Sequence, residues 1–383
     1  MIRGAPAAVN APLPSSISLA ATDCLTAFGD ARQTHRALLE SRRALAFHPV
    51  LGGDGGDPVP LALAAGHAYD ETVPPSWLEP LAGLAARLPD DPWGTARFPV
   101  FVTSSNFGVG SLHAFRRTGD ARHLHYGTPF ATVEVLRERF GWGPNVAVVS
   151  HACVSAHLGL LLATRALERG LAARALVFSF DFVSPFVAGG FHALKILNAG
   201  LPAPYSAAGT TGSIGLGDGA AFAVLAPAAG GARPALRLTA QTLHNEMHHF
   251  TANRSDGAGF AACLAPVQTT LARRRFWIKG HGTGTLEAGR LEAATLARLF
   301  PSAPLVAWKG SLGHTLGSCG LVELAIVGEA LRAGMVPGTV GTEPPFFSDA
   351  VAAEPFPSRD YDGVLLTSNA FGGAHAACFL SHD

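Results

Sequence analysis

Four residues capable of nucleophilic or acid–base chemistry follow apolar, strand-like runs of this sequence. Cys153 follows "NVAVVS", His281 follows "FWIKG", and "PLVAWKG" leads into Lys309 and His314. Reactive residues of open α/β sheets gather where strands end and helices begin, so we expect these four to converge. A cysteine at a helix N-terminus is favoured as the thiolate by the helix dipole, and two imidazoles could supply the donors or base that it needs.

Each of these residues also has an ordinary structural explanation. A single cysteine is usually buried packing, a single histidine is more often structural than catalytic, and "HGTGT" at 281–285 could be a simple turn. Their joint occurrence at strand ends favours a nucleophilic site over these separate explanations.

The composition is that of a large protein with a well-buried core. The chain has 383 residues, 48% of them hydrophobic and only 15% charged, which is enough for two core-bearing halves. Lys and Arg together balance Asp and Glu at 28 each, which argues against nucleic acid or an anionic membrane as the main partner. Low charge with many apolar residues also suggests surface buried in an oligomer.

The chain shows no targeting or spanning segment, and its cysteines do not form a recognisable framework. The first residues lack an apolar h-region, and no apolar run reaches the roughly 18 residues that a membrane span needs. Five scattered cysteines without a CxxC motif indicate reduced thiols rather than disulfides or a zinc site. We therefore expect a cytoplasmic protein in which four cysteines are small core residues.

Strand-like runs alternate with helical patterns along the chain, which predicts an α/β fold with largely buried sheets. The predicted strands are 98–105, 145–150 and 175–180 in the first half, and 276–280, 304–310 and 363–368 in the second. The Gly- and Pro-containing stretch 226–234 is the expected boundary. "NVAVVSHACVSAHLGLLLA" and "APLVAWKGSLGHTLGSCGLVELAI" share a strand–turn–helix pattern that suggests duplication.

Several spaced motifs, in order, resemble the elongating, Cys-His-His type of β-ketoacyl-acyl carrier protein synthase in the thiolase superfamily. They are "HACVSA", "HGTGT", "KGSLGH" with "GSCGLVE", and "SNAFGG", with "GGF" and "GLGDGAA" in further agreement. The resemblance covers about 17 to 380. It implies a thiolase-like fold of two pseudo-symmetric α/β halves, 15–226 with the nucleophile and 234–383 with both histidines, in a layered αβαβα sandwich.

The resemblance also implies a role for each matching residue. Cys153 would accept the acyl group, and His281 and His314 would assist decarboxylation of a malonyl extender. Lys309 and Glu323 would hold the histidine network. The remaining implied residues are the oxyanion amides of Cys153 and Phe371, and Thr251, Thr283, Thr285, Phe371 and Gly372 along the substrate's path. The phosphopantetheine arm would arrive on the acyl carrier protein, so no cofactor is expected on this chain.

The chain departs from the family pattern at several positions: His151 for Thr, Gly289 for Asp with Glu292 keeping a later acidic position, Asn369 for Phe, Ala370 for Gly, and His375 for Asn. Because alanine avoids positive φ, we expect Ala370 to narrow the swing of Phe371, the aromatic residue that admits the acyl chain in relatives.

The expected partners are the carrier protein and a second ketosynthase-like subunit, identical or related, with no nucleic acid and no metal. The apolar strand 175–180 is the expected inner edge of that dimer. Two alternative functions are a non-catalytic chain-length-factor-like subunit and a thiolase or other acyltransferase. His244 and His248 are spaced like metal ligands but lack a third ligand. The arginines that could meet a carrier protein are Arg116, Arg117, Arg122 and those at 273–275.

Overall fold

The computed structural model describes residues 17–49, 58–69, 72–208, 212–228, 236–249 and 252–382. Ten strands form one continuous sheet made of two five-stranded halves. The first half contains β1 (Ile17–Leu25), β4 (Val100–Thr103), β5 (Val146–Val149), β6 (Ala175–Asp181) and β8 (Gly219–Pro227). The second half contains β9 (Leu236–Asn245), β10 (Phe276–Lys279), β11 (Leu305–Val306), β14 (Gly363–Ala370) and β15 (Ala374–His382).

The two halves have the same topology. Counted along the chain, the strands of each half lie in the order first, fifth, fourth, second, third, starting from the junction. Pairing directions also match, since β4 and β10 are parallel to both of their neighbours and the remaining pairs are antiparallel. Only two residue pairs, Ile17–Leu238 and Ser18–Arg237, join β1 to β9. The predicted fold class, with two pseudo-symmetric α/β halves, is confirmed.

The first half carries six α-helices among the described residues: α1 (Ala31–Leu39), α2 (Leu78–Ala85), α3 (Val109–Thr118), α4 (Pro129–Arg139), α5 (Ser155–Glu168) and α6 (Pro185–Ala193). The second half carries α7 (Ala258–Leu271), α8 (Leu286–Leu299), α9 (Lys309–Leu312) and α10 (Cys319–Ala333). Short 3₁₀ helices are η1 (Ala121–Tyr126), η2 (Leu316–Ser318) and η3 (Ser358–Asp360). Two small sheets are formed by β2 (Ala46–Pro49), β3 (Pro58–Ala62) and β7 (Leu216–Gly217), and by β12 (Met335–Val336) and β13 (Phe356–Pro357).

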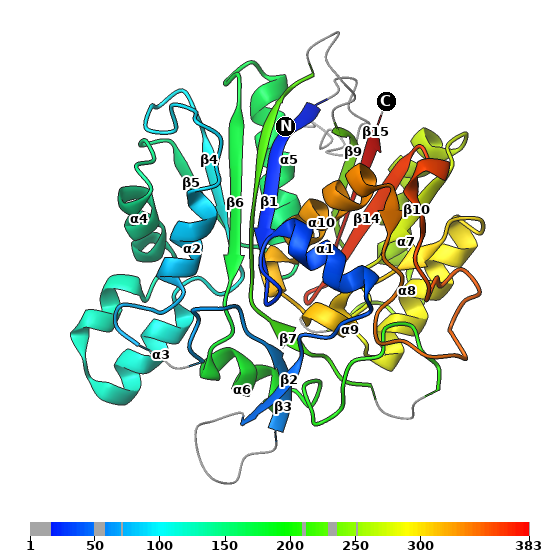
Figure 1. The fold of residues 1–383 in the computed structure, drawn as a ribbon, viewed down its shortest axis with the longest axis horizontal. Helices are drawn as coiled ribbons and strands as arrows, with labels where there is room; N and C mark the ends of the chain where they lie inside the picture. The colour runs from blue at the N-terminus through cyan, green and yellow to red at the C-terminus, as the bar shows by residue number, and fades with distance from the viewer. Residues whose placement is uncertain are drawn as a thin grey trace, which may run out of the picture.

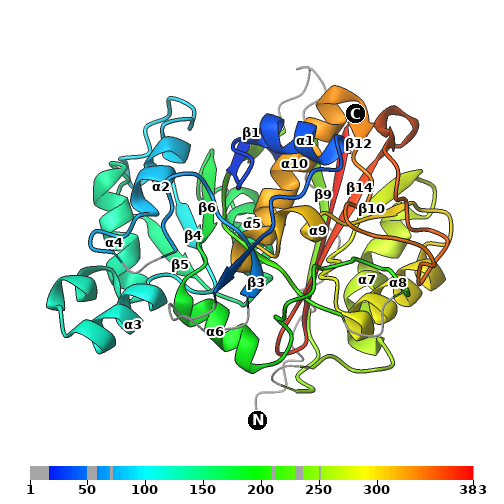
Figure 2. The ribbon, with the colours of Figure 1, turned by 60° about the horizontal axis from the view of Figure 1, so that its bottom comes forward.

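The elements stack in five layers (Figure 1). Helices α2 and α4 lie outside the first half-sheet, and α7 and α8 outside the second, while α5 and α10 lie between the two. Helices α5 and α10 contact each other and strands of both halves, and Figure 2 shows the same central position from another side. Since α5 follows Cys153 and α10 follows His314, the central layer brings the two predicted catalytic segments together.

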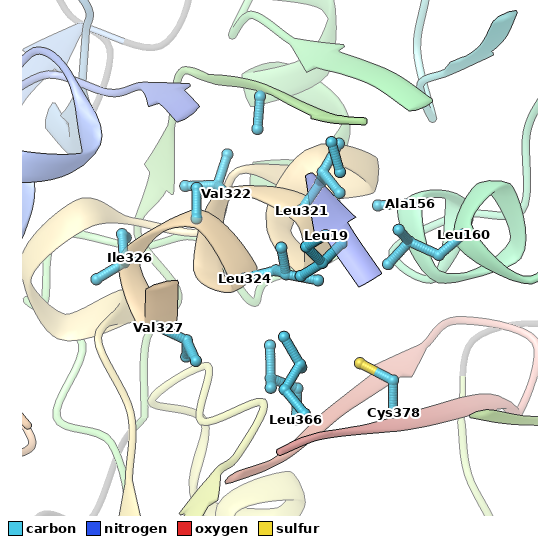
Figure 3. Close-up of a cluster of buried hydrophobic side chains, with 14 of the residues drawn as sticks. Leu19, Ala156, Leu160, Leu321, Val322, Leu324, Ile326, Val327, Leu366 and Cys378 are labelled. Carbon is cyan, nitrogen blue, oxygen red and sulfur yellow. The ribbon is translucent and has the colours of Figure 1, made fainter. Parts of the chain in front are cut away.

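The largest apolar cluster fills this central layer (Figure 3). Leu160 of α5 and Leu324 of α10 are fully buried with Leu19 of β1 and with Leu366 and Cys378 of β14 and β15. Burying one such leucine contributes about 1.5–3 kcal/mol. The helices that follow the nucleophile and the histidine are therefore anchored in a dry core. No helix among the described residues has the length and apolar character to cross a bilayer.

Two expectations about strands are wrong. The run 175–180 is an interior strand, because β6 pairs with β8 on one side and β4 on the other, and all its residues are buried. A continuous apolar run is typical of a strand covered on both faces, which does not identify an edge. The edge of the first half is β5. The strand predicted at 304–310 is shorter in the structure, where β11 covers Leu305–Val306 and α9 already begins at Lys309.

The change from the first half to the second falls between Pro227 at the end of β8 and Leu236 at the start of β9. Most of the predicted boundary, 226–234, lies outside the described residues. The division into 15–226 and 234–383 therefore stays a prediction.

Candidate active site

Cys153 lies on a tight elbow between β5 and α5. Ala152, immediately before it, has a positive φ of 45°, a conformation that side chains other than glycine seldom adopt and that is often found at functional sites. Ser155 holds the elbow, because its Oγ donates to the Ala152 carbonyl oxygen (2.7 Å) and accepts from the His151 amide (2.7 Å). The cysteine comes one residue before Val154, the N-cap of α5.

His314 contacts the cysteine directly. Its Nε2 lies 3.1 Å from Cys153 Sγ, although the two residues are 161 positions apart in the sequence. The Leu316 amide donates to the other ring nitrogen, Nδ1, at 3.2 Å. A nitrogen that accepts a hydrogen bond carries no proton, so the neutral ring has its proton on Nε2 and donates it toward the sulfur.

His281 lies beside His314 in the same cavity. The two rings are 5.0 Å apart between centroids and nearly perpendicular, at 86°. The backbone is held by Glu292, whose carboxylate accepts from the amides of His281 (2.6 Å) and Gly282 (2.9 Å). Nδ1 of His281 is buried and has no hydrogen-bond partner among the described residues.

Both histidines are neutral donors rather than cations. Burial, and then the charge of Lys309, hold the pKa of His281 and of His314 well below the usual value. The two imidazoles therefore stay uncharged throughout the neutral range.

The expectation of a thiolate at rest is wrong. Cys153 is buried, and its burial raises the pKa of the thiol well above the usual value. Lys309 and the Phe371 backbone amide lower the pKa of this thiol, but desolvation outweighs them. Cys153 is therefore protonated in the empty site, and its proton must leave as the substrate reacts.

Lys309 and Glu323 lie directly behind the histidines. Lys309 Nζ donates to the His281 carbonyl oxygen (2.8 Å) and to Glu323 Oε1 (2.7 Å). The Glu323 carboxylate holds the pKa of Lys309 above its usual value although burial opposes it. This ion pair fixes the segment that carries His281.

A cavity of about 520 Å³ opens from Cys153 between residues of both halves. Thr283 and Thr285 line it, with their hydroxyls 3.1 Å apart. Phe371 also lines it and stacks on Phe191 of α6, with ring centroids 5.8 Å apart. Thr251 lies outside the described residues, and the next residue, Ala252, lines the cavity.

The expected effect of Ala370 on the Phe371 turn is wrong. Ala370 is the last residue of β14, paired with Ala374, and its φ is not positive. The positive φ values belong to Gly372 (85°) and Gly373 (70°). Alanine at 370 therefore adds no strain, because the strand extends one residue further than the turn motif indicates.

Three polar residues of the site, Lys279, Tyr205 and Glu246, were not singled out from the sequence. Lys279 shares Glu323 Oε1 with Lys309 at 2.7 Å. Glu292 also accepts from the Tyr205 hydroxyl at 2.9 Å. The scarcity of lysine, three in the whole chain, is the signal that could have identified Lys279.

The third of these residues, Glu246, lies beside two positions at which the chain departs from the family pattern. His375 and Asn369 face each other across β14 and β15, with His375 Nδ1 2.7 Å from Asn369 Oδ1. Glu246 lies 3.5 Å from the other ring nitrogen of His375. All three residues line the cavity, so the two substitutions are coupled in one polar wall.

The described residues contain no cluster of three or more His, Cys, Asp or Glu side chains placed to hold a metal. His244 lies in β9 opposite His375, and His248 is exposed beyond the end of that strand. All five cysteines are free and buried. Cys319 is more than packing, since its Sγ donates to the Cys153 carbonyl oxygen at 3.4 Å.

The two matching halves, with Cys153 on a strand–helix elbow of one and His281 and His314 in the other, have the thiolase-like fold. Solved structures agree across the whole fold. One is a ketosynthase in complex with its chain length factor from Xenorhabdus doucetiae (TM-score 0.78, 19% identity, 96% of this chain and 98% of that one). Another is a type II polyketide ketosynthase in complex with its acyl-carrier protein (TM-score 0.81, 16% identity, 97% and 100%).

Sequence comparisons find similarity to β-ketoacyl synthases. Residues 238–343 match the beta-ketoacyl synthase C-terminal domain. The chain is 27% identical over 267 residues to the tetracenomycin polyketide synthase ketoacyl synthase alpha subunit of Streptomyces glaucescens, covering 65% of this chain and 62% of that protein. It is 26% identical over 258 residues to 3-oxoacyl-[acyl-carrier-protein] synthase 2 of Coxiella burnetii, covering 62% of each. The alignments to the first three curated relatives span 55–66% of the lengths of those proteins. The matched region, residues 238–343, is therefore similar to a β-ketoacyl synthase C-terminal domain.

Proposed function

We propose that this chain is a β-ketoacyl synthase that acts on carrier-protein thioesters. The observation that carries the proposal is the contact between His314 Nε2 and Cys153 Sγ, with the ring tautomer set by the Leu316 amide. This arrangement presents a neutral hydrogen-bond donor at the atom where a thioester would react.

In the first step, the Cys153 thiol exchanges with an acyl thioester. The sulfur bonds to the acyl carbon, the bond to the pantetheine sulfur breaks, and the thiol proton goes to that departing sulfur. The backbone amides of Cys153 and Phe371 are the proposed donors to the oxyanion, each worth a few kcal/mol in the transition state. The step balances without an external base, which suits a buried, protonated thiol.

In the second step, a malonyl thioester loses CO2 and the resulting enolate attacks the acyl group on Cys153. Negative charge develops on the thioester oxygen, where neutral imidazoles of His281 and His314 would donate hydrogen bonds. The released cysteine sulfur takes up one proton. Lowered histidine pKa values support this role, because a protonated imidazole would be costly in the buried site.

The arm that carries the substrate belongs to the acyl carrier protein, so we propose no resident cofactor. Thr283 and Thr285 are the proposed contacts of the arm within the cavity, and Gly372 and Phe371 lie along the acyl path. We place the reaction in the cytoplasm, which the free cysteines support. Arg116 and Arg117 of α3, both exposed, are candidate contacts for the acidic carrier.

Acyl loading tests this function. Incubation of the protein with an acyl-carrier thioester should add one acyl mass, and peptide mapping should place it on Cys153. Cys153→Ala should abolish the adduct. Cys263→Ala is the control, because it changes a buried cysteine that is hydrogen-bonded to Thr242, and it should not abolish the adduct. A folded protein that accepts no acyl group, alone or with a related subunit, would instead support a chain-length-factor-like role.

A further inference from the structure

The chain has only three lysines, and two of them meet beneath the catalytic residues. Lys195 is exposed after α6, whereas Lys279 and Lys309 are 0% and 2% exposed. Arginine supplies the remaining cationic side chains. Lysine has a compact charge and a pKa that burial can change, so its use at two buried positions indicates a specific electrostatic role.

Lys279 is held at the end of β10 by three contacts. Its Nζ lies 2.7 Å from Glu323 Oε1, donates to the Gly280 carbonyl oxygen at 2.6 Å, and lies 5.5 Å from the centroid of the Trp308 ring. Lys309 uses the same Glu323 oxygen at 2.7 Å. One carboxylate thus serves two ammonium groups.

Two ammonium groups share the Glu323 carboxylate, and the further carboxylate that acts on Lys309, Glu292, accepts from the His281 and Gly282 amides and the Tyr205 hydroxyl. Lys309 alone would pair the carboxylate and would still hold the His281 carbonyl oxygen. A buried charge without a counter-charge is normally avoided. The charge of Lys279 acts on His281 and His314, the groups that would donate to the thioester oxygen where the proposed reaction develops negative charge.

We propose that Lys279 is a positioning residue of the catalytic centre, which shares Glu323 with Lys309 and so adds a second positive charge behind His281 and His314. The proposal rests on the proposed function for its purpose, but the electrostatic effect can be measured without any substrate. The Lys279 charge adds to burial and to Lys309 in keeping both imidazoles in the neutral, donating form, and it favours anionic states in the cavity.

The titratable groups that face Lys279 come from four elements. Glu323 and Cys319 lie on α10, Lys309 on α9 and His157 on α5, and His281 follows β10 itself. Lys279 also acts on His314. Its positive charge lowers the pKa of His157, His281 and His314, while burial lowers the pKa of Lys279 to about 8.

The first experiment removes the charge and keeps the volume. In Lys279→Met, the NMR-detected proton affinity of His281 and His314 should rise about three- to tenfold, because a nearby like charge has gone. Lys279→Arg should retain most of the wild-type values, and Lys195→Met, on the exposed lysine, should change neither. The acid limb of malonyl-carrier decarboxylation should move to higher pH in Lys279→Met only.

The second experiment uses the wild-type protein and does not depend on any variant folding. With ¹⁵N-labelled lysine the chain gives only three ammonium signals, and one should titrate near pH 8, well below the exposed Lys195. A Lys279 ammonium that is already deprotonated at neutral pH would overturn the proposal, because the residue would then carry no positive charge. So would unchanged histidine titrations in a folded Lys279→Met. If no carrier substrate is turned over while the histidine titrations shift as stated, the proposed function fails and the electrostatic assignment stands.

Discussion

At the scale of single residues, the reactive cysteine and its histidine partner are matched by their protonation states. The thiol is protonated and the imidazole is a donor, so neither needs a charge in the empty site. Negative charge would develop on the thioester oxygen only when substrate is present. The neighbouring cluster of Lys279, Lys309 and Glu323 is already in place to stabilise that charge.

The glycines after Phe371, rather than Ala370, should control acyl admission. Gly372 has a φ of 85° and open space where a Cβ would lie, so Gly372→Ala should strain the turn by about 1–2 kcal/mol without a clash. We expect altered preference between short and long acyl-carrier thioesters in loading assays, with malonyl decarboxylation largely retained. Phe371→Ala should change the same preference.

Ala370→Gly is the matched control for this turn, because it restores the family residue at a strand position. It should leave acyl preference near that of the wild type. A larger change in Ala370→Gly than in Gly372→Ala would show that the strand end, and not the glycine pair, governs the gate. Equal loss of loading and decarboxylation in Phe371→Ala would show that this ring positions the catalytic centre instead.

At the scale of elements, the nucleophile depends on how Ser155 closes the elbow. Ser155→Ala removes two hydrogen bonds of 2.7 Å and should lower the free energy of unfolding by about 1–2 kcal/mol. Acyl transfer to Cys153 should fall as well, because the positive φ of Ala152 is no longer held. Thermal unfolding and acyl-loading rates measure the two effects.

Ser18→Ala is a suitable comparison, since Ser18 Oγ donates to the Ala226 carbonyl oxygen at 3.2 Å on β1, at the junction with the second half-sheet. It should cost some stability and leave the loading rate unchanged. If both variants slow loading equally, the elbow geometry has no special part in acyl transfer.

Much of the fold could be predicted because apolar runs and glycine-rich turns are local signals. The strands around Val100, Val146 and Phe276 lie close to where their runs predict them. The edge of the sheet could not be predicted, because β6 is apolar for the same reason as any strand with two neighbours. The position of Cys153, His281 and His314 at strand ends was enough to predict that they lie close together. The contact between Lys279 and Glu323 could not be predicted, because it depends on how β10 is placed relative to α10.

At the scale of the whole molecule, the free edge of the first half-sheet is β5, where Val146, Ala147 and Val148 are only partly buried. We expect two subunits to pair along this edge, because an unpaired apolar edge strand invites association. Ala147→Glu would place like charges near the two-fold axis and should give a monomer by sedimentation velocity at micromolar concentration.

Met247→Glu adds the same charge at a residue that is 85% exposed and lies just beyond β9 in the second half. It should leave the dimer intact. A wild-type protein that sediments as a monomer, with and without a related subunit, would contradict pairing through β5.

The narrow junction between β1 and β9 has a consequence for how such a chain can diverge. Each half has a complete sheet of its own, yet neither contains both the Cys153 sulfur and the imidazole of His314 that contacts it. A change in either half that shifts α5 against α10 alters the catalytic distance, whichever half it occurs in. Two halves of the same topology therefore meet at one site, and neither can be altered there independently of the other.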